Sequence, residues 1–422
     1  MKHRMILGCL VVMMFWMVHD SAAHHVIAHD AADTGGEGLG LNSLLQIGRS
    51  NALSTLLGSL FGGNGITLAP ASGHAPHFTV SSTAAVNQLN RQIAREIGVF
   101  PFTSSQGGFT YAFDTAQGTF VRTTQTLGPI FAEKASTLGR GKLNFNTTYT
   151  FYTFNRFNGE SLNNLRVMAE HQPDVLGNVE QREGFENDVI LIALDLSLRV
   201  RLVSLAATYG VTDRLDIGVL LPIVNVNMNV KANARIITSP DNPTPDVHTF
   251  SGAPTSPIDE RQSSATGIGD VIIRAKYHFL DSQIADISGA LLARLGTGDE
   301  ENFLGTGTTS LRPVLIVSRT IAGLFTPHLN IGYDFHVDQG SRNSLEYAAG
   351  FEVGSDQFTV GFDLLGTYRP KDDNGTHIVN GSLGAKWNPL KQFVLFLNAQ
   401  IPFNDSGLRS NLVTTFGAEY SF

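Results

Sequence analysis

The C-terminal stretch Thr414–Phe422, with the sequence TTFGAEYSF, decides the fold. Successive side chains of a β-strand point to opposite faces, so this stretch has one apolar, aromatic face and one polar or small face. Such a strand suits a barrel whose outside contacts lipid and whose lumen is polar. The stretch therefore predicts the closing strand of a transmembrane β-barrel. The apolar face consists of Leu412, Thr414, Phe416, Ala418, Tyr420 and Phe422.

The N-terminus has the three parts of a secretory signal peptide. A basic start precedes an apolar run from Met5 to Val18, and a small-residue cleavage site ends at Ala23. The run is shorter than the roughly 20 residues that a membrane-spanning helix needs. Cleavage near Ala23 removes Cys9, the single cysteine, so no disulfide is expected in the mature chain. We predict that residues 1–23 are a signal peptide and that the protein is exported.

Composition narrows the choice of compartment and partner. The chain has 422 residues, of which 16% are charged, and its formal net charge is −8. The acidic balance argues against nucleic acid as a partner. After the signal peptide, no segment has the 18 or so consecutive apolar residues of a transmembrane helix. The exported chain is therefore periplasmic, secreted or an outer-membrane barrel, and the strand pattern must decide.

Residues 24–140 are not strand-periodic throughout. Apolar residues recur at near-helical spacing in 41–62 and 81–98, which predicts two short helices. Residues 109–122 read as a hairpin around Gly118. We predict an N-terminal, partly helical extension that stays in the periplasm, plugs the lumen, or does both.

Residues 141–422 contain about 12 extended segments, or about 14 if 109–125 joins the wall. Short connections alternate with longer ones, which is the plan of bacterial outer-membrane barrels. A soluble β-sandwich also alternates polar and apolar faces, but the signal peptide, the aromatic terminal strand and the sorted loops favour the barrel. The segments lie near residues 142–155, 188–209, 215–237, 265–280, 285–297, 310–321, 325–338, 343–353, 357–369, 376–387, 391–402 and 409–422. The predicted fold is an all-β membrane protein, an antiparallel transmembrane β-barrel with an N-terminal extension or plug.

Three runs carry a resemblance to a known family. They are Thr208–Pro222 (TYGVTDRLDIGVLLP), Gly267–Phe279 (GIGDVIIRAKYHF) and Arg294–Arg319 (RLGTGDEENFLGTGTTSLRPVLIVSR). Together they resemble outer-membrane proteins associated with the MetA pathway of phenol degradation, which are distantly similar to FadL-type hydrocarbon transporters. The resemblance extends over residues 109–422. It implies a channel or transporter in the outer membrane, and it brings no defined catalytic or binding residues.

Charged side chains on the faces assigned to the lumen are the candidate site residues. Their signs are mixed, whereas a ring of one sign would indicate ion selectivity. Paired charges that brace a polar lumen are one interpretation, and a transport path over some of them is the other. The candidates are Asp195, Arg199, Arg201, Arg274, Lys276, Arg294, His328, Asp334, His336, Asp363, Arg369 and Lys386.

The sequence gives only weak signals for metal binding or catalysis. His328, Asp334 and His336 share a face and could form a metal or proton site, but lumen lining is the preferred interpretation. The acidic run Asp299–Glu301 could bind calcium or be a solvated loop. No spacing demands a nucleophile or an acid–base set. The sequence therefore predicts no enzyme, cofactor or metal.

Two functions stay open. The first is a channel for passive uptake of small, hydrophobic or aromatic molecules. The second is a barrel that does not transport and instead has a structural, adhesive or partner-docking role at the surface. Expected partners are outer-membrane lipid, an unidentified small-molecule substrate and the barrel-assembly machinery, which would recognise Tyr420 and Phe422.

Overall fold

The computed structural model describes residues 52–60, 90, 93–97, 104, 110–114, 119–122, 126–170, 188–241, 248–250, 257–337, 340–371, 375–390 and 392–422. The predicted signal peptide and most of the two predicted helices lie outside the described residues. Within 41–62, α3 (Leu53–Leu56) and the 3₁₀ turn η1 (Leu57–Ser59) are helical, and within 81–98, residues 93–97 are helical. In the part of the chain that the structure describes, no helix is long and apolar enough to cross a membrane.

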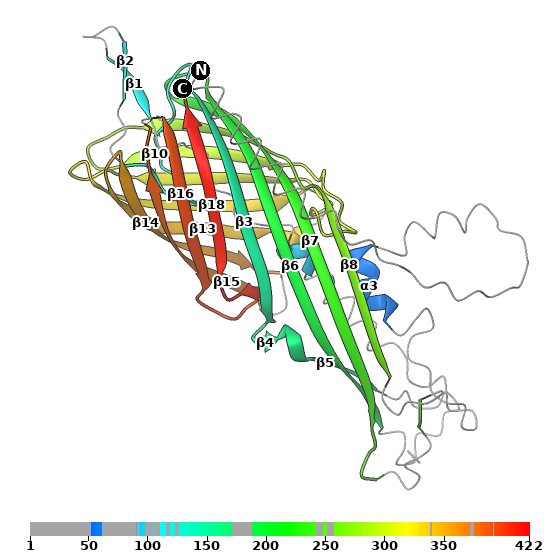
Figure 1. Ribbon diagram of the computed structural model, residues 1–422. Coiled ribbons are helices and arrows are strands. Elements are labelled where there is room, and N and C mark those ends of the chain that lie inside the picture. The colour runs from blue at the N-terminus through cyan, green and yellow to red at the C-terminus, as the bar shows by residue number, and fades with distance from the viewer. Residues whose placement is uncertain are drawn as a thin grey trace, which may run out of the picture. The chain divides into compact units, whose positions relative to one another are not determined.

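Twelve of the described strands close into one antiparallel barrel (Figure 1). Neighbours in the sequence are neighbours in the ring, and β3 completes it by pairing with both β18 and β6. The predicted closing strand is thus confirmed. The ring consists of β3 (Leu143–Phe157), β6 (Val189–Gly210), β7 (Leu215–Ile237), β9 (Ile272–Leu280), β10 (Asp286–Arg294), β11 (Ser310–Ser318), β12 (Phe325–His336), β13 (Ser344–Gly354), β14 (Phe358–Arg369), β15 (Thr376–Trp387), β16 (Phe393–Pro402) and β18 (Val413–Ser421).

Short elements supplement the ring. The hairpin β1–β2 pairs only with itself among the described residues, so it does not enlarge the wall. The segment expected as a loop after β3 contains β5, which pairs with the projecting end of β6. These elements are β1 (Tyr111–Asp114), β2 (Thr119–Arg122), β4 (Glu160–Ser161), η2 (Leu162–Asn164), β5 (Leu165–Glu170), β8 (Ile258–Ile268), η4 (Gly340–Arg342) and β17 (Leu408–Ser410).

The single strand predicted at 265–280 is instead two strands. β8 pairs with the projecting part of β7, and β9 pairs with the part of β7 near its start. The break at residues 269–271 has a steric reason. A Cβ on Gly269 would lie 2.9 Å from the carbonyl oxygen of Leu304, because the loop between β10 and β11 packs against the wall there.

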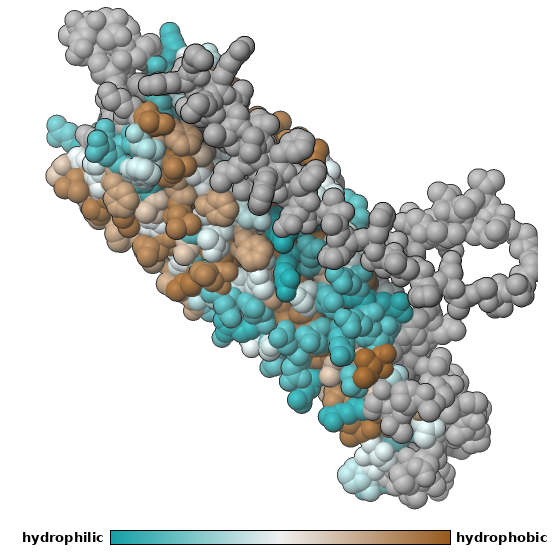
Figure 2. Space-filling view, viewed as in Figure 1, coloured by the Kyte–Doolittle hydropathy of each residue, from teal (hydrophilic) through white to brown (hydrophobic). Residues whose placement is uncertain are grey.

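The barrel has an apolar outside and a polar inside. On β12, the outward Leu329 and Phe335 are 41% and 48% exposed, whereas the inward Thr326 and Asp334 are 0% and 1% exposed. Figure 2 shows apolar residues gathered over the half of the barrel nearer the C-terminus. Large apolar side chains that face outward would be costly in water, and they match the lipid-facing band of an outer-membrane barrel.

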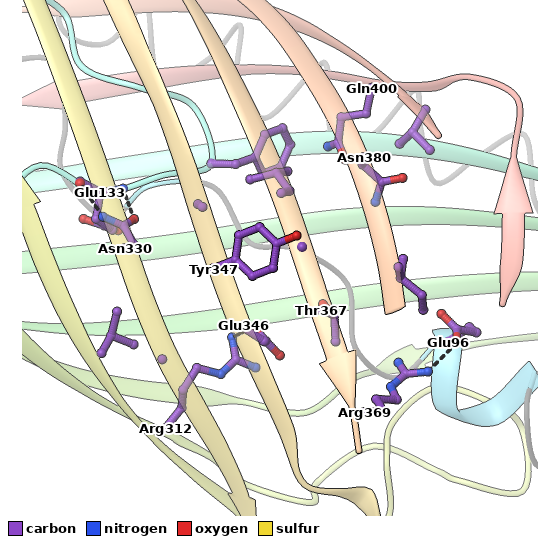
Figure 3. Close-up of a pocket in the computed structure, with 18 of the residues that line it drawn as sticks. Glu96, Glu133, Arg312, Asn330, Glu346, Tyr347, Thr367, Arg369, Asn380 and Gln400 are labelled. Carbon is purple, nitrogen blue, oxygen red and sulfur yellow. Dashed lines mark hydrogen bonds and ion pairs between the residues drawn. The ribbon is translucent and has the colours of Figure 1, made fainter. Parts of the chain in front are cut away.

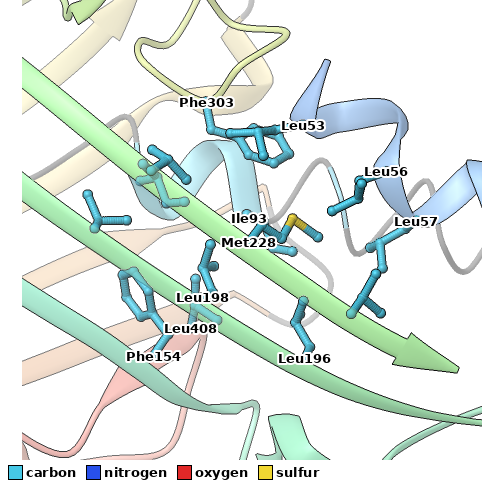
Figure 4. Packing of buried hydrophobic residues seen from close by; sticks show 14 of the residues in the cluster. Leu53, Leu56, Leu57, Ile93, Phe154, Leu196, Leu198, Met228, Phe303 and Leu408 are labelled. Carbon is cyan, nitrogen blue, oxygen red and sulfur yellow. The ribbon is translucent and has the colours of Figure 1, made fainter. Parts of the chain in front are cut away.

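β6 and β7 are much longer than the other strands and project past the ring at the end opposite the C-terminus (Figure 1). Their inward face in this projecting part is apolar. Residues 52–60 and 93–97, which we call the N-terminal segment, cover it (Figure 4). Leu53 and Ile93 are fully buried there. The Leu53 and Ser54 N–H groups donate to Asn302 Oδ1 (3.2 Å) and to the Glu301 carbonyl oxygen (2.9 Å), so the β10–β11 loop holds α3 in place.

Candidate functional site

A segment just before β3, residues 126–140, crosses the lumen, and we call it the internal segment. Its Leu127 N–H donates to Thr359 Oγ1 (2.9 Å) on β14, and its Ala135 N–H donates to Ser318 Oγ (2.9 Å) on β11. Its Leu138 N–H donates to the Asp216 carboxylate on β7. All three acceptors lie near strand ends that border short turns. Because short turns mark the periplasmic side of such barrels, the internal segment lies at that side.

Asn330 makes the most specific attachment of the internal segment. Its Oδ1 accepts from the Glu133 N–H at 2.7 Å, and its Nδ2 donates to the Glu133 carbonyl oxygen at 2.9 Å (Figure 3). The amide therefore satisfies both backbone groups of Glu133, as a neighbouring strand would. The Glu133 carboxylate pairs with Arg274, and Lys276 Nζ lies 3.7 Å from it. Attachment thus combines backbone hydrogen bonds with buried ion pairs.

A second ion pair holds the adjacent residue. Lys134 Nζ lies 3.0 Å from the Glu352 carboxylate of β13, and Thr126 also hydrogen-bonds to that carboxylate. Thr126 and Lys134, eight residues apart in the internal segment, therefore converge on one buried acid. Apolar contacts accompany these bonds, because Ile130 and Phe131 pack on Phe396 of β16.

Beyond the internal segment lies a cavity of about 250 Å³ (Figure 3). Its far end is bordered by Glu96, which pairs with Arg369 at the end of β14. Aromatic and aliphatic side chains make up much of its wall, and charged groups are set between them. The apolar part of the wall includes Phe131, Tyr152, Phe154, Leu292, Val314, Ile316, Leu365, Ile378 and Leu408.

The charged groups of the cavity wall are held by partners. Arg312 donates to Asp334 at 3.0 Å and also pairs with Glu346. Arg409 donates to the Val379 carbonyl oxygen (2.7 Å) and to Asn380 Oδ1 (2.9 Å). Fixed donors and acceptors among apolar surfaces can orient a small guest with a polar substituent, because its ring can lie on the apolar wall.

Most of the predicted site residues do face the interior. Two of them, Arg274 and Arg369, also line the cavity. Others pair with one another or with a neighbouring strand: His328 Nε2 lies 2.6 Å from Asp363, and Lys386 Nζ lies 2.8 Å from Glu419. The inward set comprises Arg274, Lys276, Arg294, His328, Asp334, His336, Asp363, Arg369 and Lys386.

Asp195, Arg199 and Arg201 are a correction, because the structure places them on the outer face of β6. Their neighbours Leu196 and Leu198 point inward and are buried in the cluster beneath the projecting strands. Side chains of β6 do alternate between two faces, but the face that was expected to point into the lumen points outward in this stretch. Here the apolar face meets the N-terminal segment rather than lipid, so the polar face is the one that looks out.

Several residues of the site escaped the sequence analysis. Glu133 and Lys134 lie in a stretch with no period, where the only signal was the chain break at Gly128–Pro129. Arg312 lies on a strand whose faces Pro313 confuses. Only the pairing of these residues across the lumen reveals their role, and pairing between distant strands leaves no local pattern.

The acidic loop between β10 and β11 is engaged locally. Asp299 Oδ1 accepts from the Glu301 N–H at 3.0 Å, and Glu300 pairs with Arg342 at 2.9 Å. Across the described ranges, no group of three or more His, Cys, Asp or Glu side chains is placed to hold a metal ion.

Together, the closed barrel, its apolar outer band and its internal segment define the class: an integral β-barrel protein of the bacterial outer membrane. Residues 196–409 match the model of the family described as "Putative MetA-pathway of phenol degradation". This match spans half of the chain, and the protein belongs to that family. No curated protein matches the sequence.

Solved structures of outer-membrane barrels are also similar. An outer membrane channel from Pseudomonas putida F1 is 13% identical over 68% of this chain and 98% of that chain, with a TM-score of 0.44. The Ralstonia pickettii toluene transporter TbuX is 11% identical over 67% and 90%, with a TM-score of 0.35. A Pseudomonas aeruginosa FadL homologue is 9% identical over 67% and 89%, with a TM-score of 0.30.

Proposed function

We propose that this protein is a channel for passive uptake of small hydrophobic or aromatic molecules across the outer membrane. The observation that carries the proposal is the cavity between the internal segment and the Glu96–Arg369 pair. Dry apolar cavities of roughly 150 Å³ already accept benzene, so a volume of about 250 Å³ is enough for one substituted ring. The description of the family, which names phenol degradation, supports an aromatic guest.

The proposed route runs through the lumen. A guest enters from the loop end, occupies the cavity, and leaves into the periplasm when the internal segment moves aside. The internal segment is suited to such a role because it is attached by side chains of several strands and is not itself a strand of the wall. The charged groups of the lumen then serve as bracing and attachment, and we propose transport rather than catalysis.

Uptake into proteoliposomes tests this function, with radiolabelled phenol and a similar-sized sugar as probes. Ala348→Trp should slow phenol uptake, because Ala348 lines the cavity and an indole would fill much of it. Ala349→Trp is the matched control, since the next residue of β13 faces outward and pairs with Leu329 and Leu364. Equal uptake by both variants would contradict the route. No uptake by the wild type or by a 24–108 deletion would instead favour the partner-docking barrel.

A further inference from the structure

On the outer surface of β6, β7 and β8, the side chains change from apolar to polar between two adjacent rows; on β3 the change comes one row later, after Phe151. The strand register aligns these rows across the four strands. The last apolar row is Tyr149, Val203, Ile223 and Ile268. The next two rows, further from the C-terminus, are Phe151, Arg201, Asn225 and Thr266, and then Thr153, Arg199, Asn227 and Ser264.

This boundary marks the level of the outer-leaflet headgroups. On β6 the outward apolar residues run from Tyr209 to Val203, a span of roughly 20 Å along the strand and, at a tilt of about 40°, roughly 15 Å in height. The lipid-facing band ends there on this side of the barrel, because an outward arginine deeper in the band would be costly. Arg201 is the first outward residue beyond that span, and Arg199 follows it by about 7 Å. Both arginines therefore lie where a lipid headgroup meets the protein.

Among the described residues, Arg199 and Arg201 have no partner of their own. Neither makes a hydrogen bond or an ion pair among the residues that the structure describes. Their neighbours in the same rows carry no acidic group. Instead, Asn227 donates to Asn225 Oδ1 (2.7 Å), and Asn225 donates to Thr266 Oγ1 (2.6 Å). These neutral side chains form a hydrogen-bonded chain beside the guanidinium groups.

Roughly 13 Å beyond Arg199 along the same surface, charged residues lie opposite residues of the other sign. Asp195 lies opposite Lys231, and Lys231 lies opposite Glu260. The positive charge of Arg199 and Arg201 is thus concentrated at the boundary and is not a general property of the projecting sheet. Two forked guanidinium groups about 7 Å apart suit a phosphate group, which guanidinium binds through paired, charge-assisted hydrogen bonds.

We propose that Arg199 and Arg201 form an external binding site for a phosphate group of an outer-leaflet lipid of the lipid A type. The acyl chains of that lipid lie along the apolar row of Val203 and Ile223, and the amides of Asn225 and Asn227 contact its polar headgroup. The site is on the lipid-facing wall and is separate from the cavity, so it does not depend on the proposed transport.

Native mass spectrometry of the purified full-length barrel, titrated with lipid A, tests the site. The variant carrying Arg199→Gln and Arg201→Gln should bind lipid A more weakly, on the order of tenfold. The matched control carries Lys231→Gln and Arg235→Gln, which removes the same charge from outward positions of β7. Heat-modifiable migration on gels checks that each variant is a folded barrel.

The lipid probe separates phosphate recognition from general lipid adhesion. A counterpart of lipid A with the same acyl chains but no phosphate should bind the wild type as weakly as lipid A binds the arginine variant. Phosphatidylglycerol, which has a phosphate but a smaller headgroup and two chains, should bind more weakly than lipid A. Equal lipid A binding by the wild type and the arginine variant, an equal loss in the control, or equal binding of the dephosphorylated lipid would overturn the proposal.

Discussion

The attachment of the internal segment by Asn330 gives the sharpest prediction about the channel. Asn330→Ala removes two hydrogen bonds, to the N–H and to the carbonyl oxygen of Glu133. A hydrogen bond contributes about 0.5–1.5 kcal/mol net, and a buried backbone group that is left without a partner costs about 1–3 kcal/mol. Because Asn330 borders the cavity, water can replace part of the loss. A cost of about 2 kcal/mol to the attached state is therefore reasonable.

Such a cost should raise the population of the released internal segment roughly 30-fold, since about 1.4 kcal/mol corresponds to a factor of ten. Single-channel recordings in planar bilayers measure this population as the fraction of time open. Thr150→Val is the control, because it removes a buried bond between Thr150 and Thr415 (2.9 Å) that joins β3 to β18 and not to the internal segment. An unchanged open fraction in Asn330→Ala, with a folded barrel, would refute the idea that the internal segment controls permeation.

Three further predictions concern stability and assembly. Glu419→Gln should lower the unfolding free energy by about 3 kcal/mol in urea titrations, because it leaves the Lys386 ammonium buried without its charge partner at 2.8 Å. Adding Lys386→Met should recover most of that loss, and an additive loss would contradict the pairing. Leu53→Asp places a charge in the fully buried cluster under β6 and β7, so limited proteolysis should cut the N-terminal region of the folded barrel faster; unchanged cleavage would contradict the packing. Deleting Phe422 removes two backbone hydrogen bonds to Leu143, of 2.8 and 2.9 Å, and should lower the amount of heat-modifiable barrel in membranes, whereas normal amounts would exclude Phe422 as an assembly signal.

The wall of the barrel was predictable because each strand is governed by a local rule. In β12 the inward residues Thr326, Asn330 and Asp334 alternate with the outward Leu329 and Phe335, and a period of two is visible without knowing any partner. The closing pair of β18 and β3 followed from the same pattern at the end of the chain. The strand break at Gly269 was not predictable, because it lies against a loop about 35 residues later in the chain, near Leu304, and no local pattern reports that contact.

The two-residue period of a strand can be read from its sequence, but the sequence of the strand does not say which of its two faces points into the barrel. On β6, Ser204 faces the lumen and is polar, whereas Leu198 has the same parity along the strand and is apolar. The difference arises because Leu198 lies in the projecting part, where residues of the N-terminal segment cover it. No property of β6 alone contains this information, since it depends on where the membrane ends and on what fills the space beyond it. Arg199 and Arg201 were assigned to the wrong side for that reason.

The permeability of the proposed channel should likewise depend on residues that do not belong to the barrel wall. Twelve strands set the size of the lumen, but residues outside the wall occupy both ends of the cavity: Glu133 at the periplasmic side and Glu96 at the other. Each is bound to a cation of the wall, Arg274 and Arg369 respectively. In the proposed channel, a guest would meet these two acids, and the release of either acid would leave its cationic partner buried and uncompensated, which is costly. In the proposed channel, the wall arginines would act on permeation through the segments that they hold, and the mixed signs of the lumen charges would serve to form these pairs.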